Sequence, residues 1–93
     1  MPLFVLTATD KPNTAELRLA TRPAHVDYVR GSGRVKIGGP LLDAAGEMAG
    51  SLLIIEADDL AACEAFIADD PYVKAGLFEH TDLRAFKLTL GSL

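Results

Sequence analysis

Two residues of this sequence have side chains suited to moving a proton at neutral pH. His25 follows Arg22 by three positions (Arg22-x-x-His25) within a stretch of helical spacing, and Asp70 stands directly before Pro71. An imidazole titrates near neutrality and can both take and give a proton. A carboxylate bonded to one ring nitrogen fixes the tautomer and makes the other nitrogen the better base. We therefore predict that the fold brings His25 to Asp70 as a catalytic acid/base dyad; a purely structural pair is the alternative.

Two neighbours of the dyad are candidates for holding a substrate. Arg22 lies roughly one helical turn from His25 and could bind a carboxylate, a phenolate or a halide. The same arginine could instead pair with Asp27 or Asp70. Tyr72 follows the Asp70 turn, and we interpret it as a core ring with a bonded hydroxyl in preference to a proton donor.

Several function classes are disfavoured by what the sequence lacks. The two histidines, His25 and His80, have no paired spacing, so no dedicated metal site is expected. Ser51 has no G-x-S-x-G elbow around it, which argues against a serine hydrolase. No phosphate loop or dinucleotide fingerprint is present. We therefore expect no cofactor and no metal.

Length, charge and cysteine content narrow the class further. Ninety-three residues predict a single domain over positions 1–93. The net charge is −4 and no basic run occurs, so nucleic acid is not an expected partner. No stretch has the length of a membrane span or the flanks of a signal peptide. Cys63 is the single cysteine, which rules out an internal disulfide and fits the cytoplasm.

Apolar spacing predicts four strands and two helices. The strands are expected at residues 3–9, 34–41, 51–56 and 79–90. One helix should follow a cap at Asn13 or Thr14 and end at Gly31 or Gly33, and the other should begin after Asp58 or Asp59. This order is β-α-β-β-α-β, the ferredoxin-like α+β fold with a four-stranded antiparallel sheet and both helices on one face.

Local signals predict how the elements join. Pro23 should kink or break the first helix near residues 20–22. Residues 42–50 are expected to form a hairpin loop. The second helix should bury a stripe of four residues: Leu60, Cys63, Phe66 and Ile67. Pro71 suits the first position of a new helical turn, which Gly76 can end in a left-handed conformation.

Every residue of the segments 3–6 and 52–55 is apolar, so both faces of these two strands are apolar. A sheet with helices on one face should be polar on the other face if that face meets water. A second copy of the chain is the simplest cover for an apolar face. We therefore predict a homodimer formed through the sheet.

Four short motifs, in this order, resemble the YCII-related family: Arg22-x-x-His25, Gly39-Pro40, Gly50-Ser51 and Asp70-Pro71-Tyr72-x-x-Ala75-Gly76. The resemblance covers nearly the whole chain. It implies a dimeric α/β barrel, in which two ferredoxin-like subunits pack sheet against sheet, and an active site built on His25 and Asp70. Around this pair we expect five substrate-binding residues: Arg22, Gly39, Pro40, Ser51 and Tyr72.

The resulting hypothesis is a cofactor-independent enzyme of the lyase, isomerase or hydrolase type that acts on a small molecule. Its pocket should lie between the first helix and the Asp70 turn, with the backbone of residues 38–40 as its floor. The alternative is a non-catalytic barrel domain that binds a small ligand or another protein. A haem-dependent barrel would need a histidine aimed into a large apolar cavity, which nothing in the sequence demands.

Overall fold

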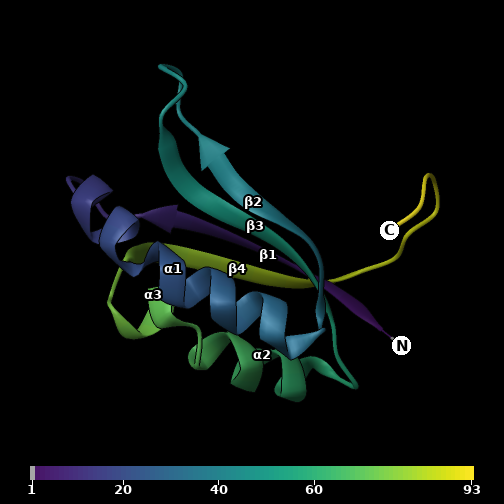
Figure 1. Cartoon of the computed structure of the whole chain (residues 1–93). Coiled ribbons are helices and arrows are strands. Elements are labelled where there is room, and N and C mark those ends of the chain that lie inside the picture. Colours follow the sequence, from purple (N-terminus) through teal and green to yellow (C-terminus); the bar gives the residue numbers. More distant parts are fainter. Residues whose placement is uncertain (1) are drawn as a thin grey trace.

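The fold is a four-stranded antiparallel sheet with helices along one face (Figure 1), and the computed structural model describes it for residues 2–93. In chain order the elements are β1 (Leu3–Asp10), α1 (Ala15–Ser32), β2 (Val35–Leu42), β3 (Met48–Glu56), α2 (Leu60–Ala68), α3 (Pro71–Lys74) and β4 (Phe78–Phe86). The strand order is β2-β3-β1-β4. This arrangement confirms the predicted ferredoxin-like α+β fold, which is the subunit fold of dimeric α/β barrels.

The core lies between the sheet and α2. Phe4 of β1 pairs with Ile55 of β3, and Leu6 pairs with Leu53, so these four side chains share one face. All four are buried and form one cluster with two side chains of the predicted stripe, Cys63 and Phe66. Burial raises the pKa of the Cys63 thiol, as expected for an inert packing residue.

Two residues of the predicted stripe are not fully buried: Ile67 is partly buried against the core cluster, and Leu60 is exposed. Leu60, at the start of α2, is 47% exposed, because it lies in the first turn at the edge of the molecule.

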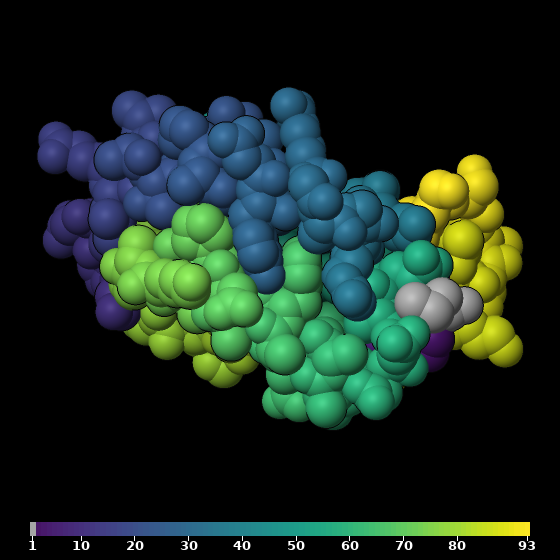
Figure 2. Space-filling view, turned by 60° about the horizontal axis from the view of Figure 1, so that its bottom comes forward, coloured from purple at the N-terminus to yellow at the C-terminus, as the bar shows by residue number. Residues whose placement is uncertain are grey.

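The two long helices are joined by an aromatic contact. The Tyr28 ring stacks on Phe66 with 5.0 Å between centroids, and its hydroxyl donates to the Phe66 carbonyl at 2.6 Å. Figure 2 shows α1 lying against the α2–α3 segment on the helical side. This packing fixes α1 relative to the turn that follows α2.

The opposite face of the sheet is also apolar. Val5 of β1 pairs with Ile54 of β3, and both point away from the helices because their neighbours Phe4 and Ile55 point toward them. Ile37 of β2 continues the same row opposite Ile54 and is 48% exposed. The helices cover only the other side (Figure 1).

Pro23 does not break α1, which is a correction of the sequence-based expectation. The helix runs through it from Ala15 to Ser32 and ends at Gly33, which has a φ of 66°. A proline removes one donor and frees the carbonyl of the residue four positions earlier, Leu19. Because Leu19 is 73% exposed, that carbonyl lies on the water-facing side of α1, where solvent can satisfy it.

The hairpin loop is shorter than predicted. β2 ends at Leu42 and β3 begins at Met48, so residues 43–47 alone form the loop. The Asp43 carboxylate accepts hydrogen bonds from the backbone of Ala45 and Glu47 and closes this turn.

The last strand also ends earlier than predicted, at Phe86 and not at residue 90. Phe86 pairs with Leu3, the first residue of β1. In the described residues 2–93, β1 begins at Leu3, so β4 has no strand partner past Phe86, and apolar composition alone does not extend the strand.

In the described residues 2–93, no helix is long and apolar enough to cross a membrane.

Candidate active site

His25 and Asp70 are hydrogen-bonded. The His25 Nδ1 lies 2.8 Å from Oδ1 and 3.0 Å from Oδ2 of Asp70. Asp70 caps α3 in an extended conformation, with Pro71 as the first helical residue, and its Oδ1 also accepts the Tyr72 N–H at 2.9 Å. Gly76 ends the turn with a φ of 74°, as predicted. The cap therefore holds the carboxylate, and the carboxylate fixes one edge of the imidazole.

The Tyr72 ring holds the flat side of the imidazole. The His25 and Tyr72 rings stack with 3.9 Å between centroids and 17° between planes. Phe78 contacts the tyrosine edge-on at 5.9 Å, and Tyr72 is only 2% exposed. Burial raises the pKa of Tyr72, although the positive charges of Arg18 and Arg22 oppose the change. The tyrosine thus keeps its proton at neutral pH and is a buried ring, as expected, that also faces the site.

A buried arginine that the sequence analysis did not consider lies beside this ring. Arg18 of α1 is 6% exposed, and its Nε and Nη2 donate to the two Asp10 carboxylate oxygens at 2.7 and 3.0 Å. Its Nη2 also donates to the Gly50 carbonyl and to the Ser51 Oγ, both at 2.8 Å. The guanidinium lies 4.8 Å from the centroid of the Tyr72 ring. Arg18 therefore ties the end of β1 and the middle of β3 to the site.

Asp10 keeps the buried Arg18 side chain positively charged. Burial alone would lower its pKa, but the hydrogen bond and the charge of Asp10, with a smaller contribution from Tyr72, raise the pKa above its ordinary value. In the sequence, Asp10 and Arg18 look like ordinary surface charges on either side of a turn. The available signal was their position: Asp10 directly follows the strand predicted at residues 3–9, and Arg18 lies early in the helix that comes next.

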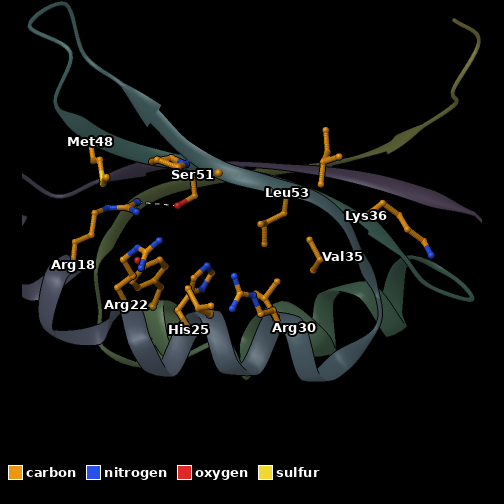
Figure 3. A pocket seen from close by; sticks show the side chains of 16 residues that line it. Arg18, Arg22, His25, Arg30, Val35, Lys36, Met48, Ser51 and Leu53 are labelled. Carbon is orange, nitrogen blue, oxygen red and sulfur yellow. Dashed lines mark hydrogen bonds between the residues drawn. The ribbon is translucent and has the colours of Figure 1, made fainter. Parts of the chain in front are cut away.

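A cavity of about 330 Å³ opens between α1 and the β2–β3 hairpin (Figure 3). Six of the seven predicted site residues line it: Arg22, His25, Gly39, Pro40, Ser51 and Tyr72. The seventh, Asp70, lies behind His25 and is 3% exposed. Residues 38–40 line the cavity as predicted and belong to β2 of the hairpin, and α1 forms the opposite wall. The predicted position between the first helix and the Asp70 turn is corrected, because that turn contributes only Tyr72 to the lining.

The lining combines positive charge with an apolar wall. Arg18, Arg22 and Arg30 contribute guanidinium groups, and no Asp or Glu belongs to the lining. The proposed pairing of Arg22 with Asp27 or Asp70 is not found among the ion pairs of residues 2–93. The apolar wall consists of Val26, Val29, Val35 and Leu53. Such a site suits a small, partly apolar compound that carries negative charge.

Solved structures include enzymes with this fold. The chain is 33% identical to 5-chloro-2-hydroxyhydroquinone dehydrochlorinase (TftG) from Burkholderia phenoliruptrix AC1100, solved in complex with 2,5-dihydroxybenzoquinone; the match has a TM-score of 0.85 and covers 91% of this chain and 93% of that one. An antibiotic biosynthesis monooxygenase superposes with a TM-score of 0.62 at 14% identity, covering 97% of this chain and 100% of that one. The second likeness shows the fold alone.

Sequence relatives agree with this match. Protein YciI of Escherichia coli O6:H1 is 37% identical over 94 residues, which cover 91% of this chain and 96% of the relative. An uncharacterised protein of Haemophilus influenzae is 32% identical, covering 90% and 95% of the two chains. Residues 2–87 match the YCII-related domain. The motifs around His25 and Asp70, the ferredoxin-like fold and these relatives lead to one conclusion: the chain belongs to the YCII-related family.

Proposed function

We propose that this protein is a cofactor-independent enzyme of the lyase type, in which His25 transfers a proton and Asp70 positions it. The observation that carries the proposal is the bond from His25 Nδ1 to Asp70 in a histidine that lines the cavity. Because Nδ1 is occupied, Nε2 is the ring nitrogen that faces a ligand. Among residues 2–93 no hydrogen bond to Nε2 is formed.

The chemistry follows from this arrangement. The substrate first takes up a proton on the carbon that bears the leaving group as one of its hydroxyls loses a proton to solvent, which makes that carbon tetrahedral. His25 Nε2 then takes the proton of a second hydroxyl; the released electron pair forms a C=O bond, the adjacent double bond shifts to the tetrahedral carbon, and the leaving group departs with its own bonding pair. The Asp70 carboxylate stabilises the imidazolium that forms. Arg22 lies one turn away on α1 and stabilises the negative charge that develops on the substrate. The imidazolium then returns its proton to solvent or to the product.

The remaining lining residues support binding. The Gly39 position is open, since a Cβ built there would meet nothing within 4 Å, so a ligand can approach the backbone closely. Pro40 pairs with Ser51 in the sheet, and the Ser51 hydroxyl is oriented by Arg18. Tyr72 lines the cavity and stacks its ring face on the imidazole.

The likeness to TftG supplies the probe. That protein removes hydrogen chloride from a chlorinated hydroxyhydroquinone, according to its name, and binds 2,5-dihydroxybenzoquinone. We infer that this chain accepts a small cyclic compound with ionisable hydroxyl groups, because its cavity is positively charged and lined by His25.

The test is incubation with 5-chloro-2-hydroxyhydroquinone under argon, with chloride release measured by a chloride electrode, alongside calorimetric binding of 2,5-dihydroxybenzoquinone. We expect binding and chloride release, with release reduced at least about 100-fold in His25→Gln. The matched control is His80→Gln, which changes the other histidine, an exposed residue of β4 outside this lining. Binding without turnover would favour the ligand-binding alternative, and equal turnover by folded His25→Gln would overturn the acid/base role.

We further propose that the protein is a homodimer formed through the open sheet face. The support is the apolar face that carries Val5, Ile54 and Ile37, on which no helix packs; Ile37 is 48% exposed, whereas Ile54 is only 5% exposed within the single chain. An obligate interface of this kind buries more than about 2,000 Å². Light scattering at micromolar concentration should give twice the chain mass, and Ile37→Lys should lower it; a monomeric wild-type protein would refute the proposal.

The same site and surface support a cytoplasmic protein that handles small molecules and not nucleic acid. The net charge is −4, and Cys63, the single cysteine, is a buried free thiol. Fractionation of the source cells with an antibody to the protein would test the compartment.

A further inference from the structure

Two arginines without an acidic partner stand on either side of His25. Arg22 and Arg30 lie on the same helix and rise with His25 into the space between α1 and the sheet, in the order Arg22, His25, Arg30 (Figure 3). Neither takes part in the ion pairs of residues 2–93, although Asp27 lies between them in the sequence. Their positive charges are therefore available to a ligand.

The other two positively charged side chains of the lining each pair with an acidic side chain. Arg18 is held by Asp10, and Lys36 points away from the cavity and pairs with Glu56 at 3.4 Å. Arg22 and Arg30 thus differ from the other lining cations in having no internal partner within the described chain.

The wall between the two arginines is apolar. Val26 and Val29 of α1 line the cavity on one side, and Val35 and Leu53 of the sheet line it on the other. The two arginines are eight positions apart, which is about 12 Å along a helix axis. The cavity therefore has a cationic end, an apolar middle beside the imidazole, and a second cationic end.

Positively charged side chains gather at the cavity, although the chain as a whole is negatively charged. The chain carries a net charge of −4, yet three of its five arginines line this cavity and no acidic side chain does. Asp10 balances the charge of Arg18, so the uncompensated positive charge of the cavity is that of Arg22 and Arg30, and an anion compensates it.

We propose that the ligand of this cavity is a dianion: a small compound with an apolar body and two negatively charged groups, one bound by Arg22 and the other by Arg30. The proposal rests on the site proposed above and names its substrate class. Arg30 is then a specificity residue, which selects compounds with a second carboxylate or oxyanion remote from the group that His25 deprotonates. A carboxylate accepts two parallel hydrogen bonds from a guanidinium, so each end also fixes the orientation of the ligand.

Equilibrium binding of simple anions tests the proposal without any turnover. The probes are benzoate and the three benzenedicarboxylates (1,2-, 1,3- and 1,4-), titrated calorimetrically into wild-type protein, Arg30→Met and Arg34→Met. Methionine keeps the aliphatic stem and removes the charge. Arg34 is the matched control, because it is an exposed arginine of the neighbouring segment that does not line the cavity.

We expect at least one dicarboxylate to bind wild-type protein about tenfold tighter than benzoate, which corresponds to about 1.4 kcal/mol. Arg30→Met should remove this preference for a dicarboxylate over benzoate, whereas Arg34→Met should retain the preference. The proposal is overturned if no dicarboxylate binds tighter than benzoate, or if the preference survives in Arg30→Met. Should Arg30→Met not fold, Arg30→Gln, which also removes the charge, takes its place with the same two outcomes.

The binding measurements test the dianion site independently of the proposed proton transfer by His25. A protein that prefers dicarboxylates but shows no proton-transfer chemistry would support the dianion site and refute the enzymatic role. A protein that releases chloride from the chlorinated probe but shows no dicarboxylate preference would do the reverse.

Discussion

Removing the buried arginine of the site should destabilise the protein far more than removing an exposed one. The perturbation is Arg18→Met, which keeps the aliphatic stem beside Tyr72 and deletes the guanidinium. The wild-type side chain donates to Asp10 twice, at 2.7 and 3.0 Å, and to Gly50 and Ser51 at 2.8 Å each. The exposed fractions of the Arg18 and Asp10 side chains are 7% and 8%, so water cannot replace these bonds without rearrangement.

The expected loss in the free energy of unfolding depends on the buried groups that Arg18→Met leaves without a partner. In Arg18→Met the Asp10 carboxylate is buried without a cation, and breaking a buried ion pair from one side costs about 3–5 kcal/mol. The Gly50 carbonyl and the buried Ser51 Oγ each lose a donor as well, which adds to the loss. Small domains have a total free energy of unfolding of about 5–15 kcal/mol, so the variant should lose a large share of its stability. Neutralising the partner as well, in Arg18→Met/Asp10→Asn, should recover part of the loss.

The assay is urea unfolding followed by circular dichroism at one fixed protein concentration, since any self-association makes stability depend on concentration. With a slope of about 1 kcal/mol per molar urea, a loss of 3 kcal/mol lowers the midpoint by about 3 M. The control is Arg84→Met, which breaks a pair with Asp82 whose side chains are 76% and 48% exposed. It should change stability by no more than about 0.5 kcal/mol. Equal effects of Arg18→Met and Arg84→Met would refute the reasoning.

Three further changes test the same structure. Asp70→Asn keeps the shape of the cap but removes its charge. Turnover should fall at least about 100-fold, while the free energy of unfolding measured in urea should fall by about 1–3 kcal/mol. Unchanged turnover would contradict the positioning role of Asp70. Burial raises the pKa of both tyrosines, Tyr28 and Tyr72. The chain has no tryptophan, so the absorbance near 295 nm reports tyrosinate, and it should rise at a higher pH in folded protein than in urea-unfolded protein. Because the unfolded chain releases these protons first, near pH 10, the fold should lose stability above that pH, and Tyr72→Phe should lose less; a rise at the same pH in both states would contradict this. A Cβ at Gly50 would lie 2.2 Å from the backbone oxygen of its neighbouring strand, whereas one at Gly39 meets nothing within 4 Å, so Gly50→Ala should lower the melting temperature markedly and Gly39→Ala hardly at all.

The pattern of the sequence determined the order of elements and the chemistry of the central pair. Alternating and continuous apolar runs predicted every strand and both long helices, because side-chain period reports which face is buried. The Asp70–Pro71 step predicted a capped turn, since a residue before proline avoids helical dihedrals and a carboxylate caps well. His25 and Asp70 were singled out by residue type and by family resemblance, and their bond is present.

Tertiary contacts decided where elements end and which charges are buried. β4 ends at Phe86 because β1 begins at Leu3, which depends on the partner strand and not on local composition. Pro23 stays within a continuous α1 because the freed carbonyl faces water, which a sequence pattern does not show. Strand and helix ends are set by what the neighbouring chain offers, and a local pattern carries no record of that neighbour.

The charged residues of the cavity show the same division. Arg18, Arg22 and Arg30 are alike in the sequence, yet Arg18 is buried against Asp10, while Arg22 and Arg30 flank His25 with no acidic partner in the described chain. Sequence spacing predicted that Arg22 lies one turn from His25, because both are on one helix. Whether an arginine meets an acid, a carbonyl or an empty cavity depends on strands and loops distant in the sequence, and only folding brings those groups within hydrogen-bonding distance.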